Sequence, residues 1–399
     1  MKCPIRNSFE DLNAMRTYFK GLSSFGSPAT VDRKTWMLAD YFQIWQVLND
    51  PNQFKAYDFR DKLKQLAELD PVKYEFSSVI EASSAWLIFM EGERHLSFKR
   101  QLKTAMYVQD LDAVIREYTD QALQELEGRT TFDLMTDFCD PLITRIICVM
   151  LGIDGRYYHL LREIVKPVVY AFEPFIGLDG LRSIGKAYEE LKEFFSNTEP
   201  SVLLPEGGIL HKLSPQEGDN GMPEALSIIE FLILAGVETS VIVFCESIYR
   251  LMTDLKHEVP GLYQEDRRKI MIEELIRMCS AASIIHRTVQ TDITMEGNSI
   301  KAGDTLWLSL ASANRDPRYF PHPDIIHPDN MEHKHLAFGS GKHYCLGTTF
   351  LTREMQIILP AFFSRFGSRC RIPENEQPVI SQRYFLPGIE KLTIQVNEP

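Results

Sequence analysis

A glycine-rich loop that ends in a cysteine constrains this chain more than any other segment. Residues 338–347 read Phe-Gly-Ser-Gly-Lys-His-Tyr-Cys-Leu-Gly, and an apolar helical pattern follows over residues 346–366. Glycines let a backbone turn sharply and approach a flat ligand closely. Positive potential at a helix N-terminus favours an ionised sulfur. The segment therefore predicts that Cys345 is a thiolate ligand, with Phe338 against the ligand and His343 within reach of an anionic edge.

This loop resembles the cysteine-ligand loop of the cytochrome P-450 superfamily, the haem-thiolate monooxygenases. The family pattern Phe-Gly-x-Gly-x-His-x-Cys-x-Gly is met at every fixed position. One cysteine gives a single strong metal bond and leaves the rest to a large cofactor, as in haem with an axial thiolate. The resemblance implies heme b (iron protoporphyrin IX), with Cys345 as the metal ligand and Phe338, His343 and Gly347 as cofactor-binding residues. The alternative is a turn that buries an inert cysteine.

Composition favours a cytoplasmic protein that does not bind nucleic acid. Lys and Arg number 43 against 55 Asp and Glu, a net charge of −12, which opposes general affinity for nucleic acid. Seven scattered cysteines fit a reducing compartment better than a disulfide framework. The N-terminus lacks the apolar run of a signal peptide or membrane anchor. Residues 225–244 are apolar but contain Glu230 and Glu238, so we expect a buried helix there.

Apolar periodicity predicts a mainly α protein with small β-sheets, which the resemblance extends to a single-domain cytochrome P-450 fold over residues 1–399. We expect β-rich parts at about 25–60 and 285–310, and a helical core over 90–280 and 346–366. Residues 172–180 are predicted to be a turn between helices and 197–221 a surface loop. A short strand is expected at 34–38 and a small sheet at 288–310. Helices are predicted over 40–48, 93–105, 111–127, 134–151, 184–195, 222–252 and 267–278.

The segment Ala235-Gly-Val-Glu-Thr-Ser240 lies inside the longest predicted helix. Glycine there costs about 1 kcal/mol relative to alanine, and threonine can bend a helix by bonding back to the preceding turn. The segment resembles the oxygen-binding groove of the family. That resemblance implies proton delivery by Glu238, hydrogen bonding to dioxygen or its water by Thr239, and a cofactor contact at Ala235. The alternative is a kinked core helix with Glu238 in a salt bridge.

Glu274 and Arg277 stand at positions i and i+3, where opposite charges on a helix can meet. Such pairs are usually solvated and contribute little. Their place 71 residues before Cys345 resembles the Glu-x-x-Arg structural pair of the family. The family usually adds an arginine from the segment before the cysteine loop, but this chain has Asn330 there. The departure puts the third member of that network in doubt.

Cationic and imidazole side chains are candidate partners for the haem propionates, because carboxylates form charge-assisted hydrogen bonds with them. Residues 93–100 resemble a His-x-x-x-Arg segment of the family, with Lys99 in place of arginine. Lysine keeps the charge but loses the two-pronged geometry of a guanidinium. The resemblance implies that His95, Lys99, Arg287 and His343 bind the cofactor.

The substrate pocket is predicted to be apolar and aromatic. The resemblance places its walls at Phe89, Leu234, Ser283, Ile284, Ile285 and Phe385. A hydrophobic intermediate of secondary metabolism is the expected substrate, with terpenoid, polyketide, alkaloid and carrier-bound amino acid all open.

The resemblance implies a monomeric monooxygenase that uses dioxygen and two electrons to hydroxylate, epoxidise or couple its substrate. No flavin or iron–sulfur domain is evident in the sequence, so we expect a ferredoxin and ferredoxin reductase as donors. A basic group suits an acidic ferredoxin, since complementary charge steers encounter. Two alternatives stay open: a peroxide-driven haem-thiolate peroxygenase and a non-enzymatic haem sensor. The basic group comprises Arg94, Lys99, Arg100, Lys103, Lys342 and Arg353.

Overall fold

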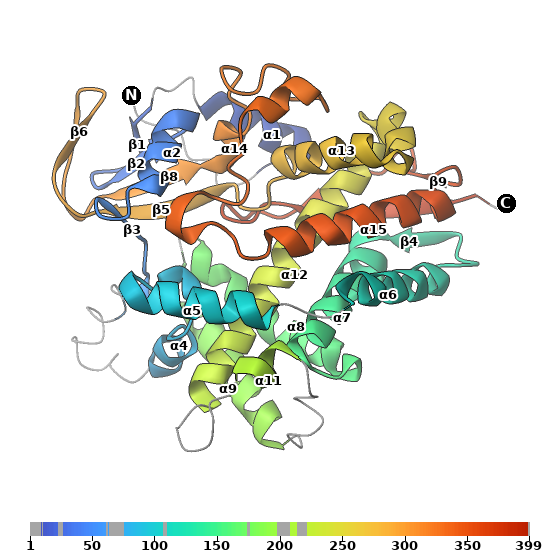
Figure 1. The fold of residues 1–399 in the computed structure, drawn as a ribbon, viewed down its shortest axis with the longest axis horizontal. Helices are drawn as coiled ribbons and strands as arrows, with labels where there is room; N and C mark the ends of the chain where they lie inside the picture. Colours follow the sequence, from blue (N-terminus) through green and yellow to red (C-terminus); the bar gives the residue numbers. More distant parts are fainter. Residues whose placement is uncertain are drawn as a thin grey trace. The chain divides into compact units, whose positions relative to one another are not determined.

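Strands from distant parts of the chain pair into one five-stranded sheet (Figure 1). Its order is β1 (Ala29–Thr30), β2 (Thr35–Leu38), β8 (Thr305–Ser309), β5 (Ile284–Val289) and β3 (Phe54–Ala56). β2 and β8 run parallel, with Thr35 opposite Thr305, and the other pairs are antiparallel. Side chains of Leu38, Leu306 and Leu308 are fully buried in the core cluster that covers this sheet.

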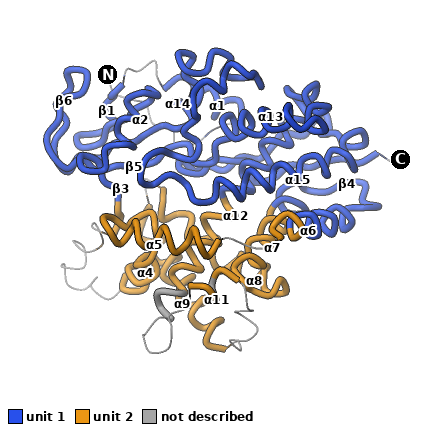
Figure 2. The backbone as a smooth tube through the Cα atoms, viewed as in Figure 1, with its two compact units in different colours: residues 1–57, 115–139, 239–399 blue, residues 58–114, 140–238 orange. Residues whose placement is uncertain are grey.

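The computed structural model describes residues 9, 11–22, 27–60, 63, 76–106, 110–173, 176–197, 208–213 and 222–397. The chain divides into two compact units (Figure 2). Unit 1 contains residues 1–57, 115–139 and 239–399, and unit 2 contains residues 58–114 and 140–238. The prediction of a single domain over the whole chain stays a prediction.

Every described strand belongs to unit 1. Smaller sheets there join β4 (Thr131–Asp133) with β12 (Thr393–Val396) and β9 (Cys370–Arg371), β6 (Ile293–Met295) with β7 (Asn298–Ile300), and β10 (Val379–Ile380) with β11 (Ile389–Lys391). The helices of this unit are α1 (Leu12–Gly21), α2 (Tyr41–Asn49), η3 (Leu134–Cys139), η6 (Lys256–Tyr263), α13 (Glu265–Met278), α14 (Leu310–Ala313), η7 (Pro328–Glu332), η8 (Gly341–His343) and α15 (Thr348–Phe366). Helix α6 (Leu111–Glu125) belongs to this unit from Ile115 onward.

The regular secondary structure described in unit 2 consists of helices alone. It contains α4 (Ser77–Ala82), η2 (Leu87–Phe89), α5 (Gly92–Ala105), α7 (Asp140–Leu151), η4 (Gly155–Tyr157), α8 (Tyr158–Val165), η5 (Lys166–Phe172), α9 (Leu178–Asn197) and α11 (Ile209–Leu213). Aromatic rings gather around Trp86, whose ring stacks on those of Phe89, Phe172 and Phe231 at centroid distances of 5.7, 5.7 and 6.0 Å.

The longest helix, α12 (Met222–Met252), begins in unit 2 and ends in unit 1, with the division after Glu238. From Leu226 it is long and apolar enough to cross a membrane, yet 72% of its most apolar window is buried. Core helices of soluble proteins have this property, so length and composition alone do not mark a membrane span. Gly236 lies where a Cβ would approach Ile147 Cδ1 to 2.9 Å, so glycine permits close packing against α7.

The expected mainly α class is confirmed, and most predicted helices lie within a few residues of their positions. Three local expectations need correction. The predicted turn at 172–180 is too long, because α9 already begins at Leu178. The helix expected at 134–151 begins as a π-helix before α7. The predicted loop at 197–221 contains the short helix α11, while residues 198–207 and 214–221 lie outside the described residues.

Candidate functional site

Cys345 lies in the short connection between η8 and α15. Its backbone N–H donates to the Phe338 carbonyl oxygen at 3.0 Å, which closes the loop. The Gly347 N–H donates to Cys345 Sγ at 3.3 Å, and the Thr348 hydroxyl donates to the Cys345 carbonyl oxygen at 3.0 Å. A backbone donor and a helix start both favour a thiolate over a thiol.

Two glycines give this loop its shape. Gly339 and Gly341 both have φ of 67°, a conformation that other residues rarely adopt. A Cβ at Gly341 would lie 2.4 Å from the Leu48 carbonyl oxygen at the end of α2. The Asn49 amide also donates to the Ser340 hydroxyl at 2.8 Å. The loop is therefore fixed against α2, and glycine is required at 341 by both conformation and space.

Exposure separates Cys345 from the other described cysteines. Cys345 is exposed, whereas Cys139, Cys148, Cys245 and Cys279 are buried and Cys370 is half-buried. Burial raises the pKa values of Cys148, Cys279 and Cys370 to about 12 each, so these thiols stay protonated. Among the described residues, Cys345 alone is an accessible sulfur beside a helix start, and this donor fits an axial ligand of haem.

Glu238 forms a buried ion pair that the sequence did not reveal in full. Its Oε1 lies 2.5 Å from a guanidinium nitrogen of Arg162, and Arg162 Nε also donates to Asp140 Oδ1 at 2.9 Å. Burial lowers the pKa of Arg162, but Glu238 and Asp140 outweigh burial and the net shift is upward. Arg162 therefore stays charged between two carboxylates. The salt bridge considered as an alternative for Glu238 is present.

The segment Ala235–Ser240, which resembles the oxygen-binding groove, lies on an uninterrupted α-helix. The α-helical assignment continues through Gly236 and Thr239, so the segment does not interrupt α12. Ala235 and Thr239 are half-buried, whereas Leu234 and Glu238 are buried. The spacing of Ala235 and Thr239 is one helical turn, which places them on one face of α12.

The candidate propionate partners lie in different units and are described separately. In unit 2, His95 is buried and Lys99 is half-buried, both on α5. In unit 1, Arg287 lies on β5 with 7% of its surface exposed, and its guanidinium donates to the His286 carbonyl oxygen at 2.8 Å. His343 ends η8, and the Phe338 ring lies 6.2 Å from that of Tyr344. Their roles toward the cofactor stay predictions.

The predicted substrate-pocket residues also divide between the units. In unit 1 the Ser283 N–H donates to the Phe385 carbonyl oxygen at 2.9 Å, while Ile284 is buried and Ile285 packs against the core cluster. In unit 2 Phe89 and Leu234 are buried. These positions leave their contact with substrate a prediction.

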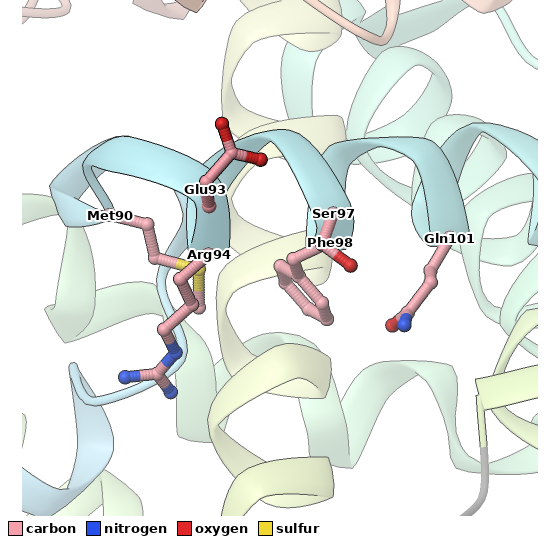
Figure 3. A pocket seen from close by; sticks show the side chains of 6 residues that line it. All are labelled: Met90, Glu93, Arg94, Ser97, Phe98 and Gln101. Atoms are coloured by element: carbon pink, nitrogen blue, oxygen red, sulfur yellow. The ribbon is translucent and has the colours of Figure 1, made fainter.

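A cavity of about 400 Å³ lies along α5 in unit 2, and none of the predicted pocket residues lines it. Figure 3 shows Phe98 and Gln101 projecting to the same side of α5, whereas the Glu93 carboxyl points to the other side. The lining residues are Met90, Glu93, Arg94, Ser97, Phe98 and Gln101.

Glu274 and Arg277 form the expected structural pair, buried to 1% exposure on both side chains, with Nε to Oε1 at 2.7 Å. Arg277 also donates to the carbonyl oxygens of Asn314 and Pro323, at 2.8 Å each. Asn330 completes the network, because its Nδ2 donates to Glu274 Oε2 at 2.6 Å. The doubt about a third member is therefore removed: an asparagine replaces the usual arginine.

Comparisons with known proteins bear on the family and the fold. A family profile described as Cytochrome P450 matches residues 269–394. The Bacillus subtilis protein "Polyketide biosynthesis cytochrome P450 PksS" is 27% identical over 76% of this chain and 75% of its own length. "Cytochrome P450 CYP107DY1" of Priestia megaterium is 26% identical over 94% of each chain. The solved structure of P450BioI with a fatty-acyl carrier protein superposes with a TM-score of 0.81, at 19% identity, over 97% of this chain and 99% of that one.

This chain belongs to the cytochrome P450 superfamily. It is a haem-thiolate monooxygenase of bacterial type. Sequence reasoning missed that Arg162 pairs with both Glu238 and Asp140, because the three residues come from α8, α12 and α7 and share no local pattern. A buried glutamate in an apolar run was the one available sign that a cation had to lie nearby.

Proposed function

We propose that this protein uses dioxygen and two externally supplied electrons to oxidise a hydrophobic small molecule in bacterial secondary metabolism. The observation that carries the proposal is Cys345, an exposed thiol with a backbone N–H on its sulfur at 3.3 Å. The name of PksS, with 27% identity, supports biosynthetic chemistry on a polyketide-like substrate. Hydroxylation, epoxidation and oxidative coupling all belong to this reaction class.

The cofactor we propose is heme b with Cys345 as its axial ligand. Thiolate-ligated haem supplies oxygen activation, since electron donation from sulfur favours cleavage of the O–O bond. The chain would hold the thiolate through the Gly347 N–H and the start of α15. Arg287 and His343 of unit 1, and His95 and Lys99 of unit 2, are proposed propionate partners by charge and hydrogen-bonding chemistry.

Thr239 and Glu238 are proposed to handle the proton. The Thr239 hydroxyl can donate to and accept from a water, and Thr239 is half-buried on α12. Glu238 is held by Arg162 at 2.5 Å, so proton transfer by its carboxyl requires that contact to lengthen. Arg162 is thereby a positioning residue for Glu238.

Electron donors and location are proposed together. Exposed Arg94, Arg100 and Lys103 project from α5, a basic surface on an acidic protein. Such a surface suits an acidic ferredoxin, reduced in turn by its reductase, in the cytoplasm. Lys342 and Arg353 of unit 1 belong to the same proposal.

Cys345→Ala tests the central assignment. We expect loss of the far-red Soret band of the reduced carbon monoxide complex, because that band requires a thiolate ligand. Cys370→Ala is the matched control, since it removes a half-buried cysteine from β9 and should leave the band in place. Survival of the band in Cys345→Ala would overturn the proposal.

Substrate and oxidant are tested by turnover. Incubation with ferredoxin, reductase and pyridine nucleotide should give product from a panel of hydrophobic compounds, including acyl chains on a carrier protein. Product formed with peroxide but without reductant would instead indicate a peroxygenase, and no product under either condition a haem sensor.

A further inference from the structure

Two histidines and an aspartate gather on the surface of unit 1, in the turn formed by residues 322–330. His322 Nε2 lies 4.0 Å from Asp329 Oδ2, and His327 Nδ1 lies 3.5 Å from the same oxygen. The two imidazole rings lie 4.0 Å apart between centroids. One potential ligand atom from each residue lies within 4.8 Å of the others. Three residue types that bind metals therefore lie close enough together to share one ion.

The backbone of this turn is held in place from the protein interior. Asn330, 1% exposed, accepts from the His322 N–H at 3.0 Å and donates to the His322 carbonyl oxygen at 2.8 Å. The His327 N–H donates to Glu274 Oε2 at 3.3 Å. Both histidines are thus fixed through buried Asn330 and Glu274. A ligand set whose backbone is already ordered loses less entropy on binding an ion.

We propose that His322, His327 and Asp329 bind one divalent transition-metal ion of the zinc class. Imidazole nitrogens and a carboxylate oxygen are ligands that zinc accepts, with bonds of about 2.0–2.2 Å. Tetrahedral geometry at those lengths needs ligand atoms about 3.4 Å apart. Side chains that are 33–60% exposed can close the observed separations of 3.5 and 4.0 Å, and His327 Nδ1 would exchange the hydrogen bond that it accepts from the Asp329 N–H for the bond to the metal. Water would fill the fourth position.

The ion would stabilise the turn and take no part in oxygen chemistry. It would join His322, at one end of the turn, to His327 and Asp329, next to Asn330. Asn330 in turn donates to Glu274 of the buried Arg277 network. The ion would therefore reinforce from outside a network in which asparagine has replaced the larger arginine. Binding to the folded state alone raises stability by mass action.

The test uses the purified holoenzyme after dialysis against a chelator, with zinc sulfate as the probe. Equilibrium dialysis counts bound zinc, and thermal unfolding records the midpoint. Wild type should bind one zinc per chain, with a midpoint higher by about 2 °C or more at saturation. His322→Ala and Asp329→Asn should weaken zinc binding at least about tenfold, and their midpoints should no longer respond to zinc.

His333→Ala is the matched control, because His333 is an exposed histidine in the same region that lies outside the cluster and contacts the Tyr319 ring. It should bind zinc as wild type does. His327 is left unchanged, since its Nδ1 also accepts from the Asp329 N–H and caps η7. Equal zinc affinity in all four proteins, or no zinc bound by wild type at about a tenfold excess over protein, would overturn the proposal.

Discussion

The Asn330 amide donates to the Glu274 carboxylate at 2.6 Å, and through this bond an uncharged residue joins the buried Glu274–Arg277 pair. The same side chain exchanges two hydrogen bonds with the backbone of His322. Arginine at this position would bring charge to Glu274 but could not also accept from the His322 N–H. With asparagine at this position, Glu274 lacks a second ion pair, but the His322 backbone gains two hydrogen bonds to the Asn330 side chain.

Asn330→Ala should lower the free energy of unfolding by about 2 kcal/mol, because it removes a donor from the buried Glu274 carboxylate and the partner of two partly buried His322 backbone groups. Asn330→Arg should also destabilise, since a larger side chain enters a site that is 1% exposed. Urea unfolding of both variants checks this. A clear gain of stability in Asn330→Arg would show that the site has room for the usual arginine.

Arg162→Met should be strongly destabilising, because it leaves Glu238 and Asp140 near each other without their shared cation. Removing one partner of a buried pair costs about 3–5 kcal/mol. The double variant Arg162→Met/Glu238→Gln should regain part of that loss, since one buried charge is gone. Chemical denaturation of the single and double variants provides the measurement, and equal losses would mean that Glu238 is hydrated in the protein.

Gly341→Ala should damage the cysteine loop more than Gly303→Ala damages its turn. Both glycines have positive φ, 67° and 85°, so each substitution costs about 1–2 kcal/mol of backbone energy. A Cβ at 341 would also lie 2.4 Å from the Leu48 carbonyl oxygen, whereas nothing lies within 4 Å at 303. Haem content and the unfolding midpoint of the two variants should differ accordingly, and matching values would argue against the clash.

Stability should fall as pH rises, in part because of Glu230. Burial raises the pKa of Glu230 from 4.5 to about 8, although the Trp86 indole opposes the shift. The unfolded chain releases this proton near pH 4.5 and the folded protein retains it to about pH 8, so the folded state loses relative stability between these values.

Glu230→Gln should therefore raise the unfolding midpoint more at about pH 8 than at about pH 5.5. Glu193→Gln, an exposed position on α9, is the control and should show no such trend. A midpoint difference that does not change with pH would mean that Glu230 ionises normally.

Reduction by a ferredoxin should slow as ionic strength rises through about 0.1 M, where screening extends over about 10 Å. Lys103→Glu on α5 should slow reduction further and leave substrate-induced spectral shifts unchanged. Lys186→Glu, an exposed lysine of α9, is the matched control in the same unit. Stopped-flow reduction measures both, and equal rates in the two variants would place the donor on another surface.

The sequence predictions were most accurate for features that depend on residues close together in the chain. The cysteine loop was predictable because its glycines, its cysteine and the following helix lie within one short segment. Helices α5, α12 and α13 were predictable from periodicity, since each begins within two residues of its expected start. The parallel pairing of β2 with β8 was not predicted, because the sequence of a single strand does not specify which distant strand it pairs with or in which register.

Side-chain partnerships across long distances could not be read from the sequence. Asn330 looked like a lost member of the network, because residue type alone suggested a missing charge. Its role depends on a fixed distance to Glu274, 56 residues away. Arg162 was missed for a similar reason. The π-helix at Leu134–Cys139 was also missed, because it keeps much the same apolar pattern as an α-helix.

Because β2 pairs with β8, the five-stranded sheet cannot be completed until β8 has been synthesised. Thr35 is synthesised well before its partner Thr305. β4 pairs at a later point of synthesis, since its partner β12 spans Thr393–Val396. During synthesis the early strands thus keep unpaired edges, which are prone to aggregate. Closure of these sheets must therefore follow synthesis of β8 and β12, and because Cys345 lies between these two strands in the chain, cofactor capture is expected to be late as well.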